Sequence, residues 1–294
     1  WDSTVSEVLG DQIEGLSPEL GAVTLDQLLS HSSGIPSDTP EMLDIYFNVR
    51  NYDYTIEQQR LLAIQDYAAT VPVVPEGSPF QYSNFAYMIA AAMIDEASGT
   101  TTENLYQTLI FEPLQMESAG FGSQATIGLY DAPVPHLLEE KDGETVITPR
   151  PWGEAADVPS ILWTVGGVHM SLRDYAKWMS YNASAGNRGP AIVEVDTLAT
   201  IHSEKVRTPT RPNPRPGTPK EGGYAYGWGN VEFDWAPAPM LQHNGSNGYN
   251  LAKVLIDTEN DLAVGVFTNV SGMDAETALG EIQGALFRQF LTTP

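Results

Sequence analysis

Two short polar stretches carry side chains suited to acyl transfer. The first contains Tyr82 and Asn84, and the second runs far downstream from His243 to Ser246. A tyrosine can act as a general base only when nearby positive charge brings its pKa well below about 10. An asparagine carboxamide donates and accepts hydrogen bonds without titrating. Each stretch is a weak signal alone, because Y-x-N triplets are common and residues 243 to 248 also resemble a hairpin turn.

Other motifs occur between and before these two stretches, in a fixed order. They are Leu28-Leu29-Ser30-His31-Ser32-Ser33-Gly34-Ile35-Pro36, Pro113-Leu114-Gln115-Met116, and Gly166-Gly167-Val168 continuing through Ser171-Leu172-Arg173-Asp174 to Trp178. Together with Tyr82-Ser83-Asn84 and His243-Asn244-Gly245, they resemble the serine β-lactamase and penicillin-binding-protein superfamily, in its class C, D-peptidase and esterase branch. The resemblance spans nearly the whole chain, with Gln115 standing where that family usually has a glycine.

The resemblance implies a role for each matching residue. In that family S-x-x-K is followed by Y-x-N and then by K-T-G or H-x-G. Tyr82 would be the general base, and Asn84 would hold the amide carbonyl of the substrate. His243 would stand where other members have a lysine, which favours a D-peptidase, D-aminopeptidase or esterase over a true class C β-lactamase. His31 lies in the turn that is structural in the family, and we interpret it as a structural residue.

The second motif also suggests where a substrate would dock. Asn244, Gly245 and Ser246 are predicted to line the substrate and oxyanion positions. Gly245 has no side chain, so a substrate can approach the strand, and the backbone of residues 245 and 246 would donate one N–H to the oxyanion.

The first family motif is missing. No serine has a lysine three positions later: Ser171 is followed by Asp174, and Ser203 has Lys205 two positions on. The resemblance therefore predicts that the chain begins just downstream of its nucleophile, which would lie on an upstream segment or a second chain. Two hypotheses follow. One is a serine hydrolase acting through an acyl-enzyme on a β-lactam, a D-amino-acid amide or peptide, or a small ester. The other is a non-catalytic ligand-binding or sensor protein that keeps the cleft.

Composition excludes several other classes. The 294 residues carry a formal net charge of −24, which disfavours binding to nucleic acid or anionic lipid. No apolar run is long enough to span a membrane. Cysteine is absent and the five histidines are scattered, so no metal site is expected. Nucleotide-binding glycine motifs are also absent, and we expect no cofactor. The family resemblance favours a periplasmic or extracellular location.

Hydrophobic periodicity predicts an α/β (α+β) fold, with an antiparallel sheet flanked by helices and a mostly helical lobe. Residues 1–223 would form the helical lobe carrying Y-x-N, and residues 224–294 the strands and closing helix carrying H-x-G. A helix is expected over 85–98 and another over 275–291, with a low-complexity loop over 207–223. A hairpin is expected at 136–138 and 145–148, and further strands at 224–229, 240–243, 249–256 and 262–268.

The resemblance adds one structural expectation. In the family fold, N-terminal strands pair with the last strand of the sheet. Without such strands, residues 262–268 would present an open apolar edge, which is an aggregation hazard. We therefore expect an upstream segment, another chain or a homodimer partner to cover it.

Overall fold

One apolar helix, α6 (Asn84–Ser98), forms the centre of the first half of the chain. It begins at Ser83, whose side chain accepts a hydrogen bond from the Ala86 N–H, and it ends at Gly99, whose φ of 69° suits glycine. Most of its side chains are buried because other helices pack around it. The computed structural model describes residues 1–36, 38–48, 53–68, 80–212 and 218–291, and it confirms the helix predicted over 85–98.

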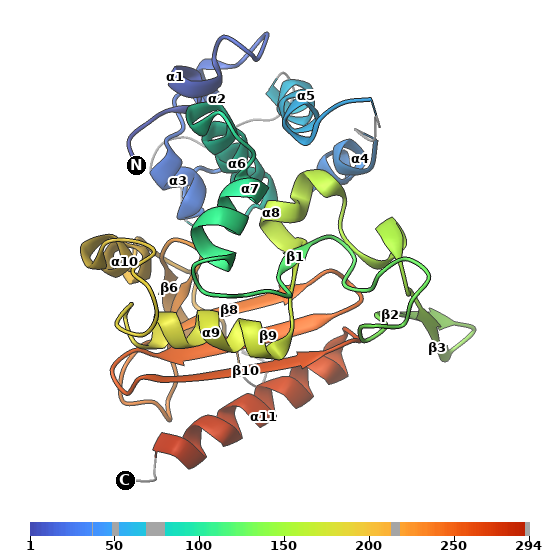
Figure 1. Cartoon of the computed structure of the whole chain (residues 1–294), viewed down its shortest axis with the longest axis vertical. Helices are drawn as coiled ribbons and strands as arrows, with labels where there is room; N and C mark the ends of the chain where they lie inside the picture. Colours follow the sequence, from blue (N-terminus) through green and yellow to red (C-terminus); the bar gives the residue numbers. More distant parts are fainter. Residues whose placement is uncertain (37, 49–52, 69–79, 213–217, 292–294) are drawn as a thin grey trace.

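Short helices surround α6 and complete the helical lobe (Figure 1). They are α1 (Val5–Leu9), α2 (Pro18–Gly21), α3 (Leu25–Leu29), α4 (Pro40–Asn48), α5 (Ile56–Ala68), α7 (Thr102–Tyr106), the π-helix η1 (Gln107–Phe111), the 3-10 helices η2 (Gly153–Ala156) and η3 (Ser160–Leu162), and α8 (Trp163–Gly166). Helices α1 and α3 begin with capping boxes, which join Thr4 to Glu7 and Thr24 to Gln27.

Six antiparallel strands form the sheet of the second half, in the order β10-β9-β8-β7-β6-β5. Their bounds are β5 (Val206–Arg207), β6 (Glu221–Tyr224), β7 (Gly229–Glu232), β8 (Met240–Ser246), β9 (Leu251–Asp257) and β10 (Leu262–Thr268). The register places His243 opposite Val254. The strands predicted over 240–243, 249–256 and 262–268 are confirmed. Residues 243–246 belong to β8, and the turn follows them at Gly248, which has a φ of 84°.

The strand predicted over 224–229 is wrong. Strand β6 ends at Tyr224 and β7 begins at Gly229, so the residues between them form a turn. Gly227 has a φ of 78°, and the Ala225 N–H donates to the Trp228 carbonyl at 2.7 Å. Strands β5 and β6 take up part of the 207–223 stretch that reads as a low-complexity loop. The division into lobes at residues 223 and 224 stays a prediction.

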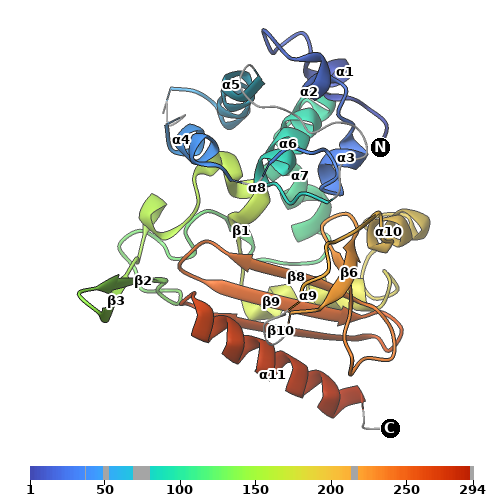
Figure 2. The same ribbon diagram turned by 180° about the vertical axis from the view of Figure 1, so that it is seen from behind.

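Two helices cover the two faces of the sheet, as Figures 1 and 2 show from opposite sides. Helix α11 (Met273–Leu291) packs on β9 and β10 through Leu255, Val264 and Phe287. Helix α9 (Leu172–Ala183) packs on the other face. The remaining elements are α10 (Val195–His202) and two antiparallel pairs of strands, β1 (Gly120–Phe121) with β4 (Val168–His169) and β2 (His136–Lys141) with β3 (Glu144–Pro149). The second pair is a hairpin and confirms the one predicted there.

Strand β10 ends the sheet on one side. Within the described ranges, β9 is its only neighbour in the sheet, so the expectation that residues 262–268 form an edge is confirmed. Its faces are covered by α9 and α11, and Val264 and Val266 are buried. Along the free side, the backbone of an edge strand offers N–H and C=O groups to another strand.

A buried ion-pair cluster joins three helices of the helical lobe. The side chain of Arg60 on α5 is fully buried; its Nη1 lies 2.6 Å from Asp95 Oδ2, and its Nη2 contacts Glu103. The N–H and hydroxyl of Thr102 also donate to Asp95, at 2.6 and 2.7 Å. Removing one member of such a cluster leaves the others buried without compensation.

We expect Arg60→Met to lower the free energy of unfolding by about 3–5 kcal/mol, because Asp95 would remain buried, and Glu103 partly buried, beside an apolar side chain. Urea unfolding monitored by circular dichroism measures this loss. Arg188→Met is the control, since Arg188 pairs with Asp261 at an exposed position and its loss is worth less than about 1 kcal/mol. Equal losses in the two variants would contradict the assignment of Arg60 as a structural centre.

Candidate functional site

The Tyr82 loop is fixed to the turn that follows α3. The Gln81 N–H donates to the His31 carbonyl at 2.7 Å, and the Ser83 N–H donates to His31 Nδ1 at 3.2 Å. Asn84 is the first residue of α6, and Tyr82 exposes 38% of its surface. The buried His31 therefore determines where Tyr82 and Asn84 are presented.

His31 sits among four aromatic rings. Its ring centroid lies 4.2 Å from that of Tyr82, 4.8 Å from Tyr224, 4.9 Å from Tyr87 and 5.8 Å from Phe80. Because Nδ1 accepts the Ser83 N–H, the proton of the neutral ring belongs on Nε2. Burial lowers the pKa of His31 to about 3, and the nearby His243 adds to this effect. His31 is thus a neutral packing residue at ordinary pH.

The second motif reaches this cluster through a tyrosine. His243 lies on β8, and its Nε2 is 3.4 Å from the hydroxyl of Tyr224 on β6. Tyr224 in turn contacts the His31 ring, which also contacts Tyr82. The structure therefore gathers two motifs that are far apart in the sequence. Burial also lowers the pKa of His243, against a smaller opposing effect from the Asn244 backbone.

The other predicted residues of this motif divide between the two faces of β8. Side chains alternate along a strand, so His243 and Gly245 share one face and Asn244 and Ser246 the opposite one. Gly245 is exposed, and a Cβ added there would meet no atom within 4 Å. The backbone at Gly245 thus borders open space on the face that carries His243.

Asp38, which sequence reasoning did not single out, contacts the first motif. Its Oδ2 accepts a hydrogen bond from Asn84 Nδ2 at 2.6 Å, and its Oδ1 accepts one from the Tyr46 hydroxyl at 3.1 Å. Burial, and secondarily the charge of Asp38, raise the pKa of Tyr82. The phenol of Tyr82 is therefore protonated at neutral pH. No sequence motif marks Asp38, because its contact with Asn84 exists only in the folded chain.

A second carboxylate lies at the far end of β8. Asn247 Nδ2 approaches Asp157 Oδ1 at 3.5 Å, and burial raises the pKa of Asp157. Asp157 Oδ2 is buried with no hydrogen-bond partner in the described part of the chain. Both carboxylates thus border the two motifs, whereas the hydrogen bonds described for Tyr224, His243, Asn84 and Asn247 involve no lysine or arginine.

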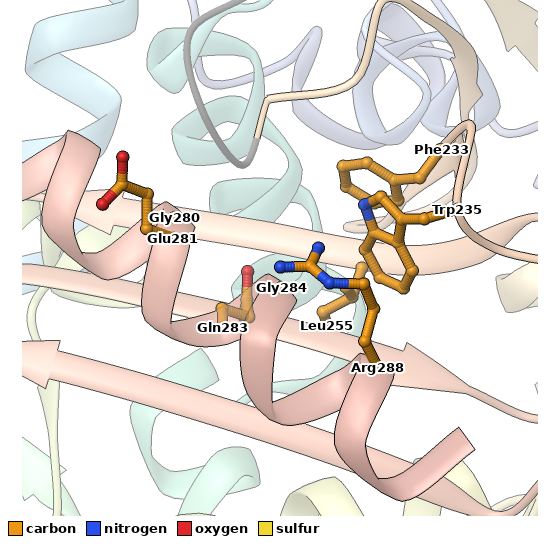
Figure 3. Close-up of a pocket in the computed structure, with 8 residues that line it drawn as sticks. All are labelled: Phe233, Trp235, Leu255, Gly280, Glu281, Gln283, Gly284 and Arg288. Carbon is orange, nitrogen blue, oxygen red and sulfur yellow. The ribbon is translucent and has the colours of Figure 1, made fainter. Parts of the chain in front are cut away.

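A hollow of about 160 Å³ lies elsewhere, beneath α11 (Figure 3). The stacked rings of Phe233 and Trp235 form one wall, and the Arg288 guanidinium lies 5.8 Å from the Trp235 ring centroid. Leu255 contributes from the face of the sheet opposite to His243. This hollow is therefore separate from the two motifs.

Among the described residues, no three His, Asp or Glu side chains gather in a way that could hold a metal ion. Within the same ranges, no helix has the length and apolar character needed to cross a bilayer.

Comparison with known proteins places the fold and the motifs in a family. A family model described as β-lactamase matches residues 1–287. The chain belongs to the β-lactamase family. This membership confirms the predicted resemblance and the predicted fold class, in which helices flank an antiparallel sheet. The members of the family are hydrolases, and the chain is a hydrolase-family protein on the same grounds.

The individual relatives are distant in sequence. The chain is 22% identical over 186 residues to unguisins hydrolase ungD of Aspergillus violaceofuscus, covering 61% of this chain and 30% of that protein. It spans about a third of the length of the curated relatives it matches first. The octameric penicillin-binding protein homologue from Pyrococcus abyssi is 24% identical with a TM-score of 0.70, over 97% of this chain and 60% of its own.

A third comparison comes from an amidohydrolase. The D-stereospecific amidohydrolase from Streptomyces sp. is 16% identical, with a TM-score of 0.72 over 96% of this chain and 79% of its own. At these identities the solved structures show a shared fold. The roles of Tyr82, Asn84 and His243 remain predictions.

Burial lowers the pKa of His202 to about 4 and that of His31 to about 3. As the pH falls, we therefore expect His202 to be protonated first and His31 only near pH 3. In the unfolded chain both histidines have a pKa of about 6.5, so the unfolded state binds more protons below that pH. The free energy of unfolding therefore falls as the pH drops from about 6.5 toward about 3, by about 1.4 kcal/mol per pH unit for each histidine. NMR titration of the imidazole protons measures the order. His31→Asn, which tolerates the φ of 57°, assigns the signal and should flatten the stability slope. Protonation of His31 near 6.5 would refute its burial among the rings.

Proposed function

We propose that this chain forms part of a serine hydrolase that acts through an acyl-enzyme on a β-lactam, a D-amino-acid amide or peptide, or a small ester. The observation that carries the proposal is the meeting of Tyr82 with His243 through His31 and Tyr224, next to open backbone at Gly245. The β-lactamase family membership supports the reaction class. The roles of individual residues rest on the motifs that match those of the family.

The proposed reaction needs a serine and positive charge from a segment outside this sequence. Tyr82 would take the proton of the serine hydroxyl as that oxygen attacks the acyl carbonyl. Its pKa is raised in this chain, so a phenolate requires a cation close by, such as the lysine of S-x-x-K. The neutral His243 cannot supply that charge alone, but its imidazole can relay a proton through Tyr224.

The oxyanion would be held at the end of β8. Backbone N–H groups aimed at the developing negative charge are worth about 2.7–4 kcal/mol each in comparable enzymes. The Gly245–Ser246 backbone would provide one donor, and the N–H of the absent serine the other. Water would then attack the acyl-enzyme, with Tyr82 again moving the proton. Side chains of Asn244 and Ser246, on the opposite face of β8, would act at most on the rim of the substrate site.

The substrate preference is proposed from the motif and the relatives. Histidine in place of the K-T-G lysine favours amide, peptide or ester substrates over β-lactams. One of the similar proteins is named as a hydrolase of unguisins, which supports hydrolysis. Another is named as a D-stereospecific amidohydrolase, which supports amide cleavage. The expectation of a periplasmic or extracellular location rests on family resemblance and stays a proposal.

A non-catalytic binding role is the second candidate. Two observations favour it for this chain alone: no serine here begins an S-x-x-K, and the three polar rings of the site are neutral at ordinary pH. A binding protein would hold an acyl compound beside Tyr82 and Gly245 and leave it unchanged.

Acylation distinguishes the two candidates. We expect this chain to form no adduct with a fluorescent penicillin or a fluorophosphonate in intact-mass analysis, and to support labelling once a segment bearing the nucleophile is supplied. Labelling restored in this way supports the hydrolase. No labelling in either case, together with reversible penicillin binding, supports the binding protein. A stoichiometric adduct on this chain alone would overturn the account of a nucleophile outside it.

Tyr82→Phe tests the base within the labelled assembly. Loss of a general base costs roughly 100-fold or more in acylation rate. Tyr130→Phe is the matched control, since Tyr130 is exposed and packs on Trp152 away from the motifs. Equal rates in the two variants would exclude Tyr82 as the base while leaving the reaction class intact.

The free side of β10 supports a partner. We propose that a strand from an upstream segment, a second chain or a second copy pairs with it; the octameric state named for the Pyrococcus relative supports self-association. We expect association by light scattering at micromolar concentration, with slow amide exchange along β10. Strand β9, paired on both sides, is the internal reference for slow exchange. A stable monomer in which β10 exchanges fast while β9 is protected would contradict a covered edge.

A further inference from the structure

We propose that Asp38, held beside Asn84, is the subsite for a primary ammonium group at the entrance to the Tyr82 site. This inference rests on the proposed function and deepens it, because it selects amine-bearing acyl donors among the candidate substrates. Its ligand chemistry is a primary ammonium, carried either by the substrate or by a lysine side chain from another segment.

The hydrogen bond between Asp38 and Asn84 fixes the direction of the carboxamide. An ionised carboxylate only accepts, so the group at 2.6 Å from Asp38 Oδ2 must be the Asn84 NH₂. The carbonyl oxygen of Asn84 then remains to accept a hydrogen bond from a ligand. The second N–H of the Asn84 NH₂ can still meet a substrate carbonyl, as the family motif implies.

Asp38 has acceptor capacity left for a ligand. A carboxylate offers about four lone-pair positions, and the contacts with Asn84 and Tyr46 use two of them. The side chain is exposed, whereas Asn84 is half-buried at the start of α6. A primary ammonium has three N–H donors, which match the Asp38 carboxylate and the Asn84 oxygen together. A neutral ligand gains nothing from the carboxylate.

An ammonium group bound at Asp38 would also lower the pKa of Tyr82. Asp38 contributes to the raised pKa of Tyr82, which opposes its use as a base. A cation docked on Asp38 cancels that contribution and adds attraction for the phenolate. An amine-bearing ligand would thereby favour deprotonation of Tyr82 when it binds, so recognition and activation would arise from the same contact.

Binding calorimetry on this chain tests the subsite without requiring turnover. The probes are D-phenylalaninamide, its N-acetyl derivative, which lacks the ammonium, and n-butylammonium, which mimics a lysine side chain. The titrations are run at about pH 6.5, below the usual α-amino pKa of about 7.7–8.0. The variants are Asp38→Asn, which keeps the shape, and Asp234→Asn, which makes the same charge change at an exposed position next to Trp235.

We expect D-phenylalaninamide to bind at least tenfold more tightly than its N-acetyl derivative. Asp38→Asn should remove this difference and leave binding of the N-acetyl compound unchanged, and Asp234→Asn should preserve it. If Asp38 only positioned Asn84, the variant would weaken both amides equally, and the proposal would fail. Equal affinity of the wild-type chain for the two amides would also overturn it.

The third probe distinguishes the two sources of ammonium. Tighter binding of D-phenylalaninamide than of n-butylammonium assigns the subsite to the substrate, and the reverse order assigns it to a lysine. A neutral fluorophosphonate reports the hydrolase without an ammonium ligand. Labelling of the assembled wild-type enzyme by this probe, together with no ammonium preference in the wild-type chain, would reject the subsite and retain the proposed hydrolase.

Discussion

The buried imidazole of His31 is the contact on which the arrangement of the site depends. Its backbone and ring accept hydrogen bonds from Gln81 and Ser83, and its ring packs against both Tyr82 and Tyr224, which also meet edge to face. The first pair fixes the loop that precedes α6, and the second joins the helical lobe to the sheet. Replacing this ring by a smaller side chain would leave a cavity beside Tyr82, Tyr87 and Tyr224. The two motifs are thus positioned by a residue that does not itself titrate near neutral pH.

Electrostatics make the site incomplete for base catalysis in this chain. Burial raises the pKa of Tyr82 and lowers the pKa of His243, so both side chains are neutral. Two carboxylates, Asp38 and Asp157, lie at either end of the motifs. Negative charge around the site favours cationic partners and disfavours the ionised form of Tyr82. The net charge of −24 gives the whole molecule the same preference, although at separations beyond about 8–10 Å salt would screen it.

Several elements could be predicted from the sequence because their signals are local. The αL glycine after α6, the capping boxes of α1 and α3, and the Asp-Gly hairpin of β2 and β3 each satisfy backbone rules within a few residues. The strand expected over 224–229 failed because its alternating aromatic residues pack in a turn, where Tyr226 stacks on Trp1. The contacts of Asp38 with Asn84 and of Tyr224 with His243 had no sequence signal, since they join segments distant in the chain. Gln115 has a φ of 55°, so the residue that departs from the family glycine keeps the backbone form that a glycine favours.

The contact between Trp1 and Tyr226 gives the molecule a mechanical property. Tyr226 follows Tyr224 by two residues, stacks on Trp1 with ring centroids 4.4 Å apart, and donates its hydroxyl to Asp26 at the start of α3. The β6–β7 turn is therefore clamped to the helical lobe on the same short segment that brings Tyr224 to His31. Such a clamp resists movement of Tyr224 away from His31. A ligand that requires Tyr224 to move would also have to break the stacking of Tyr226 on Trp1, so a contact outside the two motifs would weaken the binding of bulky ligands.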